Sequence, residues 1–130
     1  MTPRFACALA LVALAAGCAQ PPAAPPVGLL DVAERPAEKA LLAGMRAYDD
    51  AQYAQAEKQL QAALQAGLAA PRDRAAAHKL LAFIYCTSNR TSECEAQFRS
   101  ARAADPAFAL SKSEVGHPLW GPVYQRVQQR

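Results

Sequence analysis

Apolar residues recur at three- and four-residue intervals over most of the chain, which is the spacing of one face of an α-helix. Four such runs lie at residues 37–48, 53–64, 71–85 and 94–101. Polar turns or a glycine separate the runs, and the last one closes at Asp105-Pro106. The pattern therefore predicts two antiparallel helical hairpins, within a helical domain that we place at residues 36–130.

The C-terminal residues predict a cap for this pair of hairpins. Residues 107–115 can form a short helix, Gly116-His117-Pro118 breaks it, and Pro122 suits the first turn of a last helix. A stack of two hairpins leaves one flank open to water, and such stacks normally need further elements to bury a continuous core. We therefore expect an all-α fold in which the tail covers this flank.

The N-terminal residues have the pattern of an export signal. Phe5 to Ala16 is an unbroken apolar run preceded by Arg4, and it is too short to span a bilayer. Leu14-Ala15-Ala16-Gly17-Cys18 resembles the lipobox of bacterial lipoproteins, although Ala15 stands where leucine is usual. The resemblance implies that residues 1–17 are a signal peptide and that Cys18 is acylated. The alternative is ordinary secretion with cleavage near Ala19, which leaves Cys18 as a free thiol.

Prolines dominate the residues that follow the lipobox, and they favour an extended chain over a helix. We interpret residues 18–35 as a lipidated cysteine followed by a proline-rich tether. Residue 19 is alanine and not the aspartate that marks retention in the inner membrane of enteric bacteria. The resemblance to lipoproteins thus implies an anchor on the periplasmic face of the outer membrane.

The composition narrows the classes of fold and partner. Roughly a quarter of the 130 residues are alanine and only 7% are aromatic, which favours closely packed helices over strands. The net charge of +3 is spread along the chain without a basic stripe. A nucleic-acid partner is therefore not expected.

Two cysteines remain in the expected domain, on either side of the turn of the second hairpin. Antiparallel helices can bring Cys86 and Cys94 within bridging distance, and an exported chain reaches a compartment in which disulfides persist. We predict a disulfide between them; the alternative is two buried free thiols. Cys7 leaves with the signal peptide.

The sequence contains no recognisable catalytic or metal-binding motif. It lacks hydrolase signatures and a glycine-rich phosphate loop, and Asp49-Asp50 falls where a helix ends. His78 and His117 are far apart and have no paired acidic residues. We expect neither an enzyme nor a cofactor, a metal ion or a small-molecule substrate.

The two hairpins resemble the tetratricopeptide repeat. In the second unit, Leu81-Ala82, Tyr85, Cys94 and Phe98 occupy the signature positions of the repeat, and the first unit is a degenerate copy. The resemblance implies that the inner face of the first helices binds a partner protein. On that face and on the tail, the expected partner-binding residues are Leu41, Met45, Tyr48, Lys79, Phe83, Trp120 and Tyr124. Two alternatives stay open: the tail fills this groove, or the tail is itself the interaction patch.

A second resemblance concerns the whole chain. The lipobox, the tether, the paired cysteines and the tail sequence from Gly116 to Pro122 are similar to the TssQ-type lipoproteins that accompany type VI secretion systems. This resemblance implies an accessory scaffold for the membrane complex of such a system, acting by docking and not by catalysis. The alternatives are an adaptor for outer-membrane assembly or for peptidoglycan synthases and, less favoured, a small envelope enzyme or wall-binding protein.

Overall fold

The computed structural model describes residues 24–129, and within these residues the chain is helical with no β-strand. The lipobox, Cys18 and the expected signal peptide lie outside the described residues. The helices are α1 (Leu29–Ala33), α2 (Pro36–Asp49), α3 (Tyr53–Ala66), α4 (Pro71–Thr87), α5 (Thr91–Ala104), α6 (Lys112–Val115) and α7 (Gly121–Gln128). The all-α fold, with helical hairpins followed by a C-terminal cap, is confirmed.

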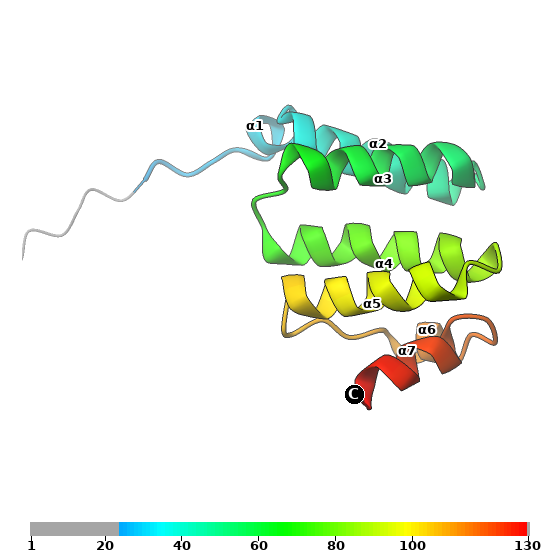
Figure 1. Ribbon diagram of the computed structural model, residues 1–130. Helices are drawn as coiled ribbons and strands as arrows, with labels where there is room; N and C mark the ends of the chain where they lie inside the picture. Colours follow the sequence, from blue (N-terminus) through cyan, green and yellow to red (C-terminus); the bar gives the residue numbers. More distant parts are fainter. Residues whose placement is uncertain (1–23, 130) are drawn as a thin grey trace, which may run out of the picture.

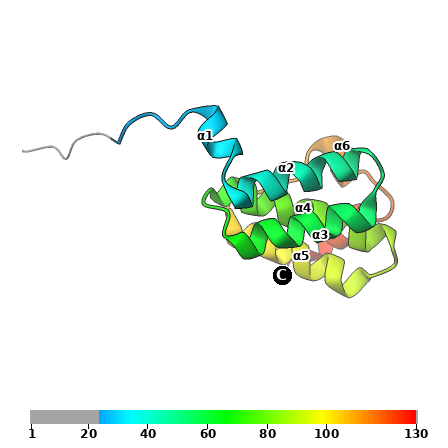
Figure 2. The ribbon, with the colours of Figure 1, turned by 90° about the horizontal axis from the view of Figure 1, so that it is seen from above.

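The helices stack as successive pairs (Figure 1). The α2–α3 hairpin lies on the α4–α5 hairpin, and α6 and α7 cover the far side of the second pair. A view along the stack places α2 and α6 on the same side of it (Figure 2). The largest side chains that are completely buried are Phe98, Leu60 and Leu81, so the core runs through both hairpins.

Local sequence explains where the helices begin and end. A proline stands in the first turn of α2, α4 and α7, where its missing N–H costs no intrahelical hydrogen bond. Gly67 ends α3 with a φ of 87°, a left-handed conformation that glycine adopts without steric cost. Of these signals, Gly67 and Pro71 also separate the two hairpins in the sequence.

The two hairpins turn in the same way although their turn sequences differ. Each turn holds one residue in the left-handed region, Ala51 with φ 58° and Asn89 with φ 60°. The next residue then donates its N–H across the turn, from Gln52 to the Ala47 carbonyl and from Arg90 to the Tyr85 carbonyl, each over 2.8 Å. The second hairpin is therefore a structural repeat of the first at its turn.

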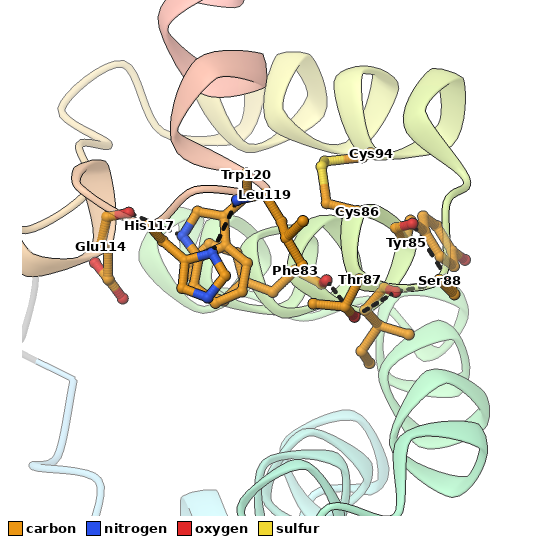
Figure 3. Close-up of a disulfide and its surroundings, with 11 residues drawn as sticks. Phe83, Tyr85, Cys86, Thr87, Ser88, Cys94, Glu114, His117, Leu119 and Trp120 are labelled. Carbon is orange, nitrogen blue, oxygen red and sulfur yellow. Dashed lines mark hydrogen bonds between the residues drawn. A yellow bond between two sulfur atoms is a disulfide. The ribbon is translucent and has the colours of Figure 1, made fainter.

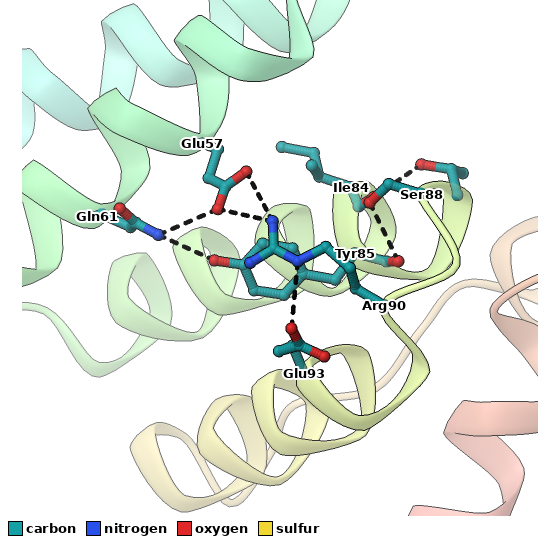
Figure 4. A network of polar contacts seen from close by, with 8 residues as sticks. Glu57, Gln61, Ile84, Tyr85, Ser88, Arg90 and Glu93 are labelled. Atoms are coloured by element: carbon teal, nitrogen blue, oxygen red, sulfur yellow. Dashed lines mark hydrogen bonds and ion pairs between the residues drawn. The ribbon is translucent and has the colours of Figure 1, made fainter.

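Polar side chains join the two hairpins beside the second turn (Figure 4). Arg90 donates to both carboxylate oxygens of Glu57 on α3, at 3.0 and 3.1 Å, and its guanidinium lies 4.0 Å from the centre of the Tyr85 ring. Gln61 on α3 donates to the Tyr85 hydroxyl over 2.9 Å. These contacts fix α3 against α4 at the end of the molecule that carries the hairpin turns.

A disulfide closes the turn of the second hairpin, as predicted (Figure 3). Cys86 in the last turn of α4 is bonded to Cys94 in the first turns of α5, with a Cα to Cα distance of 5.2 Å. Cys94 is completely buried against the core. The bridge therefore links the last turn of α4 to the first turns of α5 across the hairpin turn.

Two elements differ from the sequence prediction. The helix expected over residues 107–115 is restricted to α6, because Asp105 accepts hydrogen bonds from Ala107 and Phe108 in a turn and the chain then extends to Ser111. The short helix α1 lies within the stretch interpreted as tether and packs on α2. Both differences involve segments of about five residues, which are too short for periodicity to identify.

Gly44 permits the closest approach inside the first hairpin. A Cβ at this position would lie 2.8 Å from Cγ of Leu60, which is completely buried and has no room to move. Gly44→Ala should therefore lower the free energy of unfolding by about 1 kcal/mol, since overpacking of about 1–3 kcal/mol exceeds the helix propensity gained. Urea unfolding followed by circular dichroism measures the change. In a Leu60→Ala background the same substitution should be neutral or stabilising, and an equal loss in both backgrounds would contradict the steric explanation.

The disulfide should contribute a large part of the stability of this small domain. Cys86 and Cys94 are separated by 8 positions, and closing a loop of this size stabilises a fold by roughly 2.5 kcal/mol through the entropy of the unfolded chain. A Cys86→Ala/Cys94→Ala variant should unfold at correspondingly lower urea concentration. Thiol labelling of the denatured, non-reduced protein should find neither cysteine free; labelling of both would show that the bridge does not form.

Candidate functional site

Trp120 lies flat on the surface expected to bind a partner. Its ring stacks on Phe83 of α4 with centroids 4.2 Å apart and an interplanar angle of 19°, and His117 stacks on its other face (Figure 3). The indole N–H donates to the Glu114 carbonyl over 2.9 Å. The tail therefore covers the part of the inner surface that α4 contributes.

An ion pair holds the same part of the tail to α4. Lys79 Nζ lies 2.7 Å from Oε1 of Glu114, and both side chains are about three-quarters buried. The other carboxylate oxygen of Glu114 accepts from the Ser111 backbone N–H over 2.8 Å and so caps α6. We call the contacts of Glu114 and Trp120 with Lys79 and Phe83 the tail latch.

Burial and hydrogen bonds act in opposite directions on Glu114. Burial raises the pKa of its carboxyl, whereas the hydrogen bonds from Lys79 and Ser111 lower it, and the hydrogen bonds outweigh burial so that the pKa is below its ordinary value. Tyr48 at the end of α2 has a raised pKa because of burial, with smaller contributions from Tyr53, Asp49 and Glu114. Glu114 of the tail is thus one of the smaller contributors to the raised pKa of Tyr48.

Tyr124 is a core residue of the cap. Its ring makes edge contacts with Phe98 at 5.3 Å and with Phe108 at 6.2 Å, and its hydroxyl accepts from the buried Leu110 N–H over 3.3 Å. Gly121 permits the start of α7 to lie against the end of α6, because a Cβ there would collide with the Val115 carbonyl. The last helix is therefore fixed in place by the interior of the fold.

The expected partner-binding residues fall into four groups in the structure. Leu41, Phe83 and Tyr124 are buried, and Lys79 is paired with Glu114. Tyr48 and Trp120 are half-buried, and Met45 is exposed. Of the two alternatives for the tail, the structure has the tail folded over the α4 part of the groove. The surface that stays open lies on the side of α1 and α2.

The open side contains a cleft that the sequence did not indicate. α1 folds back on α2 and leaves a cavity of about 180 Å³ that the first turn of α4 also borders. We call it the α1–α2 cleft; it is lined by Leu29, Val32, Ala33, Glu38, Leu41, Leu42, Met45 and Asp73. The apolar residues Leu29, Leu30 and Val32, which follow the prolines, are the signal in the sequence that could have pointed to it.

The acidic residues and histidines considered in the sequence analysis can be located within the described residues. Within residues 24–129, no three His, Cys, Asp or Glu side chains are grouped so that they could hold a metal ion. Asp49 and Asp50 lie exposed at the end of α2, and His78 pairs through Nδ1 with Gln97 over 2.7 Å. No helix in this part of the chain is long and apolar enough to cross a bilayer.

A scan against protein-family models and searches of curated proteins and solved structures found no match to this chain.

The tail latch should open on acidification. Because the pKa of Glu114 is lower in the folded protein, its contribution to stability is present above the ordinary value of 4.5 and is lost as the pH falls through the lower folded value. Trp120 is the only tryptophan, so its fluorescence should shift toward that of a solvated indole below pH 4.5. Glu114→Gln should remove this transition, whereas Glu34→Gln on the exposed end of α1 should keep it. An unchanged transition in Glu114→Gln would assign it to another group.

Proposed function

We propose that this protein is a non-catalytic scaffold lipoprotein that accompanies a type VI secretion system. In this proposal, acylated Cys18 anchors it to the periplasmic face of the outer membrane. The helical domain then docks on a component of the secretion system's membrane complex. The observation that supports the proposal most directly is the pair of hairpins with equivalent turns, capped by the tail that contains the distinctive Gly116 to Pro122 sequence.

The equivalent turns support the interpretation of the hairpins as tetratricopeptide-like repeats. Ala51 and Asn89 both have a positive φ near 60°. A small residue, Gly44, lies against Leu60 in the first unit, and the small residue Ala82 is completely buried in the second. Proteins of this repeat class act by presenting helical surfaces to other proteins. This is consistent with a docking role.

The Cys86–Cys94 disulfide supports export from the cytoplasm. Disulfides persist in the periplasm and are rare in the reducing cytosol. The bridge lies in the hairpin on which the tail packs. An oxidising compartment would preserve this disulfide and so would stabilise that hairpin. This agrees with the lipobox-like sequence that ends at Cys18.

Cys18 provides the experiment that tests the proposal. Deleting the gene should reduce type VI secretion, and the wild-type protein should restore it. Cys18→Ser should not restore secretion, since the unacylated protein loses its membrane anchor. Mass spectrometry of the mature N-terminus should find acylated Cys18. Crosslinking in cells should capture a membrane-complex component with the wild type.

Two outcomes would contradict the proposal. Normal secretion after deletion, with capture of an outer-membrane assembly factor or a peptidoglycan synthase, would identify a general envelope adaptor. A mature protein that starts at Ala19 or later would remove the anchor and the assignment to the outer membrane.

A further inference from the structure

The α1–α2 cleft contains a buried carboxylate without a partner. Glu38 in the first turn of α2 is only 7% exposed, and no hydrogen bond or ion pair reaches its side chain from any described residue. A carboxylate that is largely withdrawn from water and has no donor within the chain can be stabilised by a cation that a partner supplies. Every completely inaccessible side-chain oxygen in the described residues has a hydrogen-bond partner. Because the Glu38 oxygens have none, they keep contact with the space beside them.

Within the described residues, no ion pair joins Glu38 to its neighbouring cations Arg35, Lys39 and Arg74. Lys39 lies 4.0 Å from Glu34, and Arg74 donates to the carbonyls of Leu68 and Ala69 at 3.0 and 2.8 Å. Asp73 adds a second carboxylate to the cleft from the first turn of α4. The polar part of the cleft therefore offers negative charge that these cations do not neutralise.

The rim of the cleft is apolar and exposed. Leu29 is 84% exposed, and Leu42 and Met45 are 39% and 40% exposed. All three line the cleft. α1 projects from the stack beside α2 (Figure 2). Exposed aliphatic residues gathered in one patch mark a surface that can bind another protein.

We propose that the α1–α2 cleft binds a segment of a partner protein that inserts a lysine or arginine toward Glu38 and Asp73. Aliphatic residues on either side of that cation pack on Leu29, Leu42 and Met45. The charge complementarity supplies the missing donor to Glu38, and the apolar contacts shield the pair from water. The proposal rests on the proposed function only in that the partner belongs to the envelope.

Glu38 also borders a more polar hollow beside Arg35 and Gly67. Only the α1–α2 cleft combines its carboxylate with Asp73 and with exposed aliphatic residues. Substitutions of Leu42 and Met45 therefore show on which side of Glu38 a ligand binds.

Selection from a library of random peptides displayed on phage tests the chemistry of the occupant. The full chain, purified in detergent and immobilised, should enrich peptides with a lysine or arginine flanked by leucine, isoleucine or methionine. The same selection on Glu38→Gln should lose the preference for a basic residue. Asp50→Asn is the matched control, because it removes the same charge from the exposed other end of α2 and should select the same peptides as the wild type.

Affinity measurements on the enriched peptide locate the site. Fluorescence anisotropy should show binding weakened about tenfold by Glu38→Gln, a change of about 1.4 kcal/mol. Leu42→Ala and Met45→Ala should also weaken it, whereas Leu119→Ala, which truncates an exposed leucine of the tail, should not. Unchanged affinity in the Leu42 and Met45 variants would overturn the placement in the cleft.

Thermal unfolding separates binding from folding. Glu38→Gln removes a buried unpaired charge, so the variant should unfold at the same or a higher temperature than the wild type. A lower unfolding temperature would show that Glu38 stabilises the fold and would overturn its role as an unsatisfied binding group.

Two further outcomes overturn the proposal. Selected peptides without a basic residue would exclude a cationic occupant. A concentration-dependent dimer that buries Met45 would identify a second copy of this chain as the occupant. The deletion strain tests the proposed secretion role, and the peptide selection does not depend on its result. Failure of the proposed function can therefore be distinguished from failure of the proposed cleft ligand.

Discussion

Phe98 joins the parts of this fold through two edge-to-face contacts. Its ring meets Phe83 of α4 at 6.1 Å on one side and Tyr124 of α7 at 5.3 Å on the other, and it has no exposed surface. Phe83 in turn carries Trp120, so the second hairpin and both parts of the tail share a single aromatic cluster. The two-hairpin stack would otherwise expose this flank, and a chain with so few aromatic residues uses most of them to close it.

The tail divides the inner surface of the stack into two regions of different character. On α4, the ion pair of Lys79 with Glu114 and the stacking of Trp120 satisfy the polar and apolar groups within the chain. On α2, Glu38 has no described partner and Met45 remains exposed. Surfaces whose groups are satisfied internally contribute to folding, whereas unsatisfied ones are available to a partner.

Sequence reasoning succeeded where a signal was long or local. The helical period and the prolines placed four helices, and the positions of Cys86 and Cys94 across one turn were sufficient for the disulfide. It could not place Trp120 on Phe83, because that contact depends on the path of residues 105–111, where Asp105 stops the helix expected there. Glu38 was also missed, since an acidic residue in the first turn of a helix is usually a solvated partner of the helix dipole.

The position of α1 connects the cleft to mechanical load. Among the described helices, α1 packs only on α2, and it is one wall of the α1–α2 cleft. The chain on its N-terminal side leaves the stack as an extended segment (Figure 1). A pulling force on that segment would therefore reach α1 before any other described helix. The cleft is thus the first described feature of the domain that tension in the chain would load.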